Sequence, residues 1–137
     1  MNIQESAEMY LESIHVLSQE KENVRSIDVC HKMGFSKPSV SRAMKNLKAE
    51  DYIDIDENGY ITLKEKGLAI AEKIYERHRL LTAYFVSIGV SDQTAEDDAC
   101  RIEHVISDET FNRIKEQISH RWAMALLYDD WSADEFP

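Results

Sequence analysis

The sequence predicts a mostly α-helical protein with one small β-hairpin. Glycine and proline are scarce, at four and two of 137 residues, which argues against a turn-rich β-sandwich. Apolar residues recur at helical spacing through most of the chain. One stretch instead alternates apolar and polar residues on both sides of Asn58-Gly59, a pair typical of hairpin turns. The length fits one domain, or two very small ones.

Three helices and the hairpin are predicted in the first half of the chain. The helices cover residues 5–20, Ile27–Met33 and 38–49. Ser26 has the side chain of an N-cap, Gly34 ends the short helix, and Pro38 suits the first turn of the third helix. The strands of the hairpin are Tyr52–Asp56 and Tyr60–Leu63.

The second half predicts three more helices, over 65–88, 93–106 and 109–119. Gly89 ends the first of them. Ser91 or Asp92 can cap the second, and Ser107 or Asp108 can cap the third, because their short polar side chains accept from backbone N–H groups.

A short helix, a turn with glycine, a second helix and a hairpin follow one another in the order of a winged helix-turn-helix. Residues 21–48 hold seven basic and two acidic residues, a local charge of +5 in a chain of −10. The second helix offers free N–H groups to a phosphate, and Arg42 is long enough to reach a guanine. We expect DNA contacts from Arg25, Ser36, Lys37, Pro38, Ser39, Ser41, Arg42, Lys45 and Lys48.

Two observations weigh against this interpretation. The same basic residues would also suit the solvated face of an ordinary helical hairpin. The predicted wing carries Asp54, Asp56 and Glu57, which are poor partners for phosphate.

A second chemically active group comprises Cys100, Glu103 and His104. Their spacing, i, i+3 and i+4, places the three side chains on one face of the predicted helix. A thiolate, a carboxylate and an imidazole that converge suit a transition metal such as iron, manganese, cobalt, nickel or zinc. The acidic run Glu96-Asp97-Asp98 adds attraction for cations. The motif alone also fits a half-buried helix with a core cysteine and a surface Glu–His pair.

Other features of the sequence exclude several classes of protein. No stretch approaches 18 apolar residues and the first residues lack a basic and an apolar region, so we expect no membrane span and no signal peptide. Two cysteines, Cys30 and Cys100, cannot build a disulfide framework, which predicts a cytoplasmic protein. No general base stands beside an evident open coordination position, so we expect no enzyme.

Four segments together resemble the diphtheria-toxin-repressor family of metal-dependent transcriptional regulators. The resemblance covers roughly residues 5–120. The segments are Met9-Tyr10-Leu11, Ser36-Lys37-Pro38-Ser39-Val40-Ser41, Arg77-His78-Arg79-Leu80 and the long run from Asp98 to Glu109, which is the most specific.

The resemblance implies a homodimer that binds palindromic operator DNA when Fe(II) or Mn(II) is bound as co-repressor, and that controls metal-uptake genes. It divides the chain into a winged helix-turn-helix DNA-binding domain at 1–64, a helical metal-binding and dimerisation domain at 65–120, and a C-terminal tail at 121–137 with no predicted structure. The chain ends near residue 137, which predicts a two-domain form without the SH3-like domain of longer members.

The resemblance also implies the ligands. A primary metal site falls on Met9, Cys100, Glu103 and His104. A second site uses His78, together with Glu12. The ancillary site of the iron-responsive branch falls on His78, Thr82 and Glu96, so it is only partly present.

The choice of metal is the least determined feature. The manganese-responsive branch has an acid at the position of Met9 and a glutamate at that of Cys100, so the soft pair found here favours iron. Glu12 instead resembles the manganese branch. We expect Fe(II) or Mn(II), with iron slightly favoured and Co, Ni or Zn as surrogates.

Other functions are compatible with the sequence. A winged-helix regulator can sense a redox signal or a ligand through Cys100 without a metal co-repressor. More distant alternatives are a small metalloenzyme and a purely structural dimerisation module.

Overall fold

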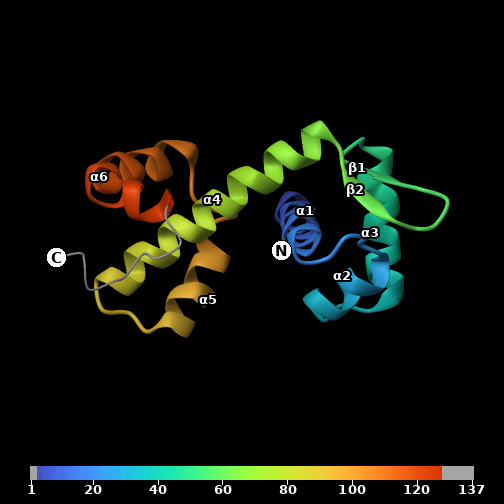
Figure 1. Cartoon of the computed structure of the whole chain (residues 1–137), viewed down its shortest axis with the longest axis horizontal. Coiled ribbons are helices and arrows are strands. Elements are labelled where there is room, and N and C mark those ends of the chain that lie inside the picture. Colours follow the sequence, from blue (N-terminus) through green and yellow to red (C-terminus); the bar gives the residue numbers. More distant parts are fainter. Residues whose placement is uncertain (1–2, 128–137) are drawn as a thin grey trace. The chain divides into compact units, whose positions relative to one another are not determined.

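The computed structural model describes residues 3–127, which form six helices and a two-stranded antiparallel sheet (Figure 1). In chain order these are α1 (Ile3–Glu20), α2 (Ser26–Met33), α3 (Lys37–Ala49), β1 (Ile53–Ile55), β2 (Ile61–Leu63), α4 (Glu65–Ser87), α5 (Asp92–Ile102) and α6 (Asp108–Leu127). The fold is mostly helical and begins with a winged helix-turn-helix, as predicted. Within residues 3–127, no helix is both long and apolar enough to span a membrane.

The chain divides into two compact units, one up to Ile74 and one from Tyr75. The division falls inside α4, so the first turns of this helix belong to the first unit. The predicted domains at 1–64 and 65–120 stay a prediction.

The helix-turn-helix is held by its caps. The sequence predicted Ser26 as the N-cap of α2, and this prediction is wrong because Arg25 occupies that position. The side chain of Asp28 reaches back and accepts the Arg25 backbone N–H at 2.9 Å, which replaces a cap by serine. Gly34 ends α2 in the left-handed conformation with φ 70°, as predicted. Ser36 caps α3 by accepting the Ser39 N–H at 3.3 Å.

The wing is the hairpin of β1 and β2, in which Ile53 pairs with Leu63 and Ile55 with Ile61. The carboxylate of Asp56 accepts the backbone N–H groups of Asn58 and Tyr60, both at 2.9 Å. This acid therefore has a structural role in the turn, which explains why the wing carries a residue that is a poor partner for phosphate.

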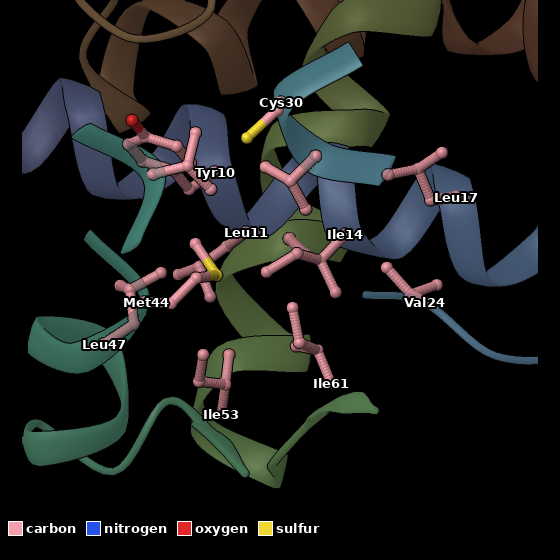
Figure 2. Packing of buried hydrophobic residues seen from close by; sticks show 13 residues of the cluster. Tyr10, Leu11, Ile14, Leu17, Val24, Cys30, Met44, Leu47, Ile53 and Ile61 are labelled. Carbon is pink, nitrogen blue, oxygen red and sulfur yellow. The ribbon is translucent and has the colours of Figure 1, made fainter. Parts of the chain in front are cut away.

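The core of the first unit gathers side chains from every element of the winged helix. Figure 2 shows Leu11 and Ile14 of α1 beside Met44 of α3 and the strand residues Ile53 and Ile61. All five are at most 3% exposed. Burial of a side chain of this size contributes about 1.5–3 kcal/mol, so this cluster fixes how α3 is presented.

The second unit differs from prediction at both of its later helices. α5 ends at Ile102 rather than at 106, and residues 103–107 form a turn. The carbonyls of Glu103 and Ile106 accept from Arg77 instead of from later N–H groups of a continued helix. α6 runs to Leu127, so it extends beyond the predicted end at 119 and into the segment that was predicted to be a tail. The rest of that tail, 128–137, lies outside the described residues.

A separate core holds the second unit together. Ser107 caps α6 by accepting the Thr110 N–H at 3.1 Å, one of the two predicted caps. The buried apolar side chains come from α4, α5 and α6 and are Leu80, Leu81, Ala83, Ala99, Phe111 and Ile118.

Gly67 in α4 tests the packing of the first unit. A Cβ at this position would meet the carbonyl oxygen of Tyr52 well inside van der Waals contact. Gly67→Ala is therefore expected to lower the free energy of unfolding by about 1–3 kcal/mol in urea denaturation, because the backbone must shift. Helix propensity alone predicts a gain of about 1 kcal/mol.

The control is Ala69→Gly at an exposed position of the same helix, which measures the propensity contribution and is expected to cost about 1 kcal/mol. A Gly67→Ala protein more stable than the wild type would contradict the close approach of α4 to Tyr52.

Candidate metal centre and nucleic-acid interface

Three potential metal ligands meet where α4 approaches the end of α5. His78 comes from α4, Cys100 from the last turn of α5, and Glu103 follows directly after that helix. The Nδ1 atom of His78 lies 2.9 Å from a carboxylate oxygen of Glu103 and 3.8 Å from the Sγ atom of Cys100. One ligand atom from each of the three residues lies within 4.8 Å of the others.

The carboxylate of Glu103 is fully buried, with 0% exposure. Its two oxygens face two imidazoles, since the other oxygen lies 3.3 Å from Nε2 of His104. Hydrogen bonds to Cys100 and to Glu103 raise the pKa of His78 from 6.5 to about 10, against the opposing effect of burial. His78 is therefore protonated at neutral pH in the metal-free protein, and it neutralises the buried carboxylate.

The donor set fits a transition metal ion. A thiolate, an imidazole and a carboxylate are each common ligands, and together they are suited to Fe(II), Co(II) or Zn(II), with the oxygen donor also suited to Mn(II). Cys100 is exposed at the rim of the group, while the carboxylate lies at its base. Such a site is accessible to an ion from solvent and has a buried charge that favours a cation.

The grouping differs from the one implied by the resemblance. His78 lies close to Cys100 and Glu103, whereas the resemblance assigns it to a second site, and that assignment stays a prediction. His104 stands in the turn after α5 rather than on the same helix face as Cys100, because α5 ends at Ile102.

The remaining predicted ligands take no part in this three-residue group. Glu96 is exposed on α5, and its carboxylate is not among the ligand atoms brought together around His78. Met9 and Glu12 lie one turn apart on α1 in the first unit. The roles of these three residues in a metal site stay predictions.

Sequence reasoning missed Arg77. Its side chain is only 6% exposed, and it donates to the backbone carbonyls of Glu103 and Ile106. The residue stands next to His78 in a motif that the resemblance had already singled out, but no local pattern indicates that its partners lie some 30 residues away.

The second candidate site is the solvent face of α3 in the first unit. Val40, Met44 and Leu47 bury the opposite face of this helix. Basic and hydroxyl side chains therefore form an exposed stripe, which we call the α3 face: Lys37, Ser41, Arg42, Lys45 and Lys48. This arrangement suits insertion of a helix into a DNA groove, with long cations on both sides.

The other predicted DNA contacts have structural partners as well. The hydroxyl of Ser36 lies 2.9 Å from that of Ser39, and both are engaged in the cap of α3. The guanidinium of Arg25 lies over the ring of Tyr60, 4.7 Å from its centre, and so contacts the wing. Pro38 is exposed in the first turn of α3. DNA contact by these residues stays a prediction.

Comparison with known protein families identifies the family of this chain. A model of the N-terminal DNA-binding domain of iron-dependent repressors matches residues 2–61, and a model of the metal-binding and dimerisation domain of these repressors matches residues 64–121. The chain belongs to the iron-dependent repressor family. This confirms the resemblance seen in the sequence, and the members of this family are transcriptional regulators rather than enzymes.

Several relatives of this repressor family are similar over most of the chain. An uncharacterised HTH-type transcriptional regulator of Methanocaldococcus jannaschii is 30% identical over 113 residues, which cover 81% of this chain and 90% of the relative. The HTH-type transcriptional regulator MntR of Geobacillus kaustophilus is 29% identical over 115 residues, which cover 84% of this chain and 82% of MntR.

Two solved structures share the fold. The structure of the manganese regulator SloR has a TM-score of 0.74 at 28% identity and covers 83% of this chain. That of the metal-dependent transcriptional regulator MtsR has a TM-score of 0.77 at 27% identity and covers 82%. The matched parts are 54% of the SloR chain and 53% of the MtsR chain, so this chain spans about half the length of these solved relatives.

The raised pKa of His78 makes metal binding dependent on pH. A metal-bound imidazole is neutral, so binding must release the proton that His78 holds below a pKa of about 10. The apparent affinity for Mn(II) is therefore expected to rise about tenfold per pH unit for each proton released, between about pH 6 and pH 8. Calorimetric titration in two buffers of different ionisation enthalpy counts these protons.

The matched variant is His78→Gln, for which the count is expected to fall by one. An Mn(II) affinity that does not change over this pH range would mean that His78 keeps its proton and does not bind the metal.

Proposed function

We propose that this chain is a metal-dependent transcriptional repressor that acts in the cytoplasm, binds operator DNA as a homodimer when loaded with Fe(II) or Mn(II), and controls metal-uptake genes. The observation that carries the proposal is the convergence of His78, Cys100 and Glu103 in the second unit of a chain whose first unit is a winged helix. Membership of the iron-dependent repressor family supports it, as does the similarity to SloR, which is a manganese regulator.

The ligands favour iron without excluding manganese. The thiolate of Cys100 is a soft donor, and the thioether of Met9 is a second one if it joins the site. Glu103 and Glu12 offer hard oxygen donors, which suit manganese. Cobalt, nickel and zinc are expected to bind as surrogates, and Glu96 and His104 complete the proposed set of ligands.

In the loaded protein, the bound ion supplies positive charge to the group of ligands. Without it, His78 provides that charge through its proton, which holds the carboxylate of Glu103. An ion held by these residues would replace that charge, and it would bind an imidazole and a thiol in their deprotonated forms. DNA affinity follows only if loading favours the DNA-binding arrangement, and a coupling of 10–100-fold, about 1.4–2.7 kcal/mol, makes a useful switch.

The DNA-binding part of the proposal depends on the α3 face. In a homodimer, two copies of α3 that lie about one duplex turn apart, roughly 34 Å, match the two halves of a palindromic operator. Lys37, Lys45 and Lys48 attract the phosphate backbone irrespective of sequence, while Arg42 reads base edges.

One observation favours a second function. Cys100 is exposed and its Sγ atom lies 3.8 Å from Nδ1 of His78, an arrangement that also suits a thiol sensitive to oxidation. In that case the chain is a redox-sensing winged-helix regulator without a metal co-repressor. Its DNA binding responds to peroxide and thiols and not to a chelator.

The decisive experiment is fluorescence anisotropy with DNA from the region upstream of the chain's own gene, under anaerobic conditions. Binding is expected to tighten at least tenfold with Fe(II) or Mn(II) and to weaken again with chelator. Glu103→Gln is expected to remove this response because the buried site loses its charge, while Glu109→Gln, at an exposed position, keeps it. An unchanged response in Glu103→Gln, or none in the wild type, would contradict the proposal.

A variant of Arg42 tests whether this residue recognises the DNA sequence. Arg42→Ala is expected to weaken operator binding by about 1–3 kcal/mol and binding to random DNA far less, because a base contact is lost. Lys45→Ala is the comparison, and it is expected to weaken both by similar factors and to lower the salt dependence. Equal losses on the two DNAs for Arg42→Ala would make this residue a phosphate contact.

A further inference from the structure

The turn between α5 and α6 carries Glu103 and His104, and one buried side chain from α4 holds it. Arg77 donates from Nη1 to the carbonyl of Glu103 at 3.1 Å and to that of Ile106 at 2.9 Å. Its Nη2 donates to the carboxylate of Asp108 in the first turn of α6. A single guanidinium therefore contacts the start of the turn, its end, and the first residue of the helix that follows it.

This arrangement replaces the hydrogen bonds of a continued helix. In such a helix the carbonyl of Ile106 would accept the N–H of Thr110. Here the Thr110 N–H donates to the side chain of Ser107, and Ile106 is left to Arg77. The carbonyl groups at the end of a helix carry partial negative charge, so a buried cation stabilises them. Arg77 thus sets the place at which the chain leaves α5.

Consecutive residues of α4 hold Glu103 at two points. Arg77 binds its backbone carbonyl, and His78 contacts its carboxylate at 2.9 Å. The second contact joins two candidate ligand atoms, Nδ1 of His78 and a carboxylate oxygen, so it would be lost if both atoms bound the same ion. The first contact uses only the backbone and can persist. The backbone of Glu103 is thus held in place whatever its side chain binds.

The geometry points to Arg77 as a positioning residue of the metal centre, which fixes the turn that presents Glu103 and His104 before any ion is bound. This inference rests on the proposed metal binding. Arg77 supplies no ligand atom, since a guanidinium stays protonated, and it acts through the main chain of the turn. Residues that orient metal ligands in this way change metal affinity by about 10–100-fold when replaced.

The test uses the full chain and Co(II), which reports its ligands through its visible absorption. Arg77→Lys keeps the charge but not the planar fork that serves three acceptors. We expect its Co(II) affinity to fall about 10–100-fold and its absorption spectrum to change in shape. Arg113→Lys is the matched control, because Arg113 lies on α6 in the same unit with 75% of its side chain exposed.

A second readout needs no metal. In chelator, amide hydrogen exchange at Val105 and Ile106 is expected to be about tenfold faster in Arg77→Lys than in the wild type, while residues near the start of α5 exchange as before. If Arg77→Lys does not fold, Asp108→Asn replaces it. This variant removes the negative charge of the exposed carboxylate that Arg77 contacts, and it is expected to show smaller losses of the same kind.

Three outcomes contradict the inference. Wild-type Co(II) affinity and spectrum in Arg77→Lys would make Arg77 a purely structural residue, even if the thermal stability falls. Unchanged hydrogen exchange in the turn would overturn its positioning role directly. A wild-type chain that binds no Co(II) would overturn the proposed metal binding and this inference with it, whereas the first two outcomes leave the metal binding intact.

Discussion

The second unit depends on one electrostatic constraint, the buried carboxylate of Glu103. An ionised carboxylate without solvent costs several kcal/mol unless an opposite charge and hydrogen bonds compensate. Here His78 compensates by keeping its proton, because hydrogen bonds to Cys100 and to Glu103 raise its pKa to about 10. A proton on His78 and a divalent cation can each compensate the negative charge of the buried carboxylate. Under the proposed metal binding, loading is therefore tied to release of the His78 proton.

Two neighbouring residues of α4 stabilise two different parts of Glu103. His78 balances the charge of the Glu103 side chain, while Arg77 holds the backbone from which that side chain extends. α4 also supplies Ala71 to the core of the winged helix and Leu80 to that of the second unit. One helix thus contributes to the core that presents the α3 face and to the candidate metal centre.

Much of the fold could be predicted from local sequence patterns, and the predictions that were wrong or incomplete share a cause. Helical periodicity, the Asn58-Gly59 turn and Gly34 were sufficient for the winged helix, since their determinants lie within a few residues. The end of α5 was missed because Ile106 continues the apolar pattern of that helix and no glycine or proline interrupts it. Its carbonyl is taken by Arg77, which lies 29 residues earlier in the chain. The grouping of His78 with Cys100 depends on a contact across 22 residues that no spacing rule contains.

The central claim is that His78, Cys100 and Glu103 hold one ion. X-ray absorption at the metal edge of the anaerobically loaded protein tests it most directly. The expected spectrum has one short metal–thiolate contribution together with nitrogen and oxygen ligands, and the thiolate contribution disappears in Cys100→Ser but not in Cys30→Ala. A wild-type spectrum without thiolate sulfur, or one that Cys100→Ser leaves unchanged, would contradict the claim.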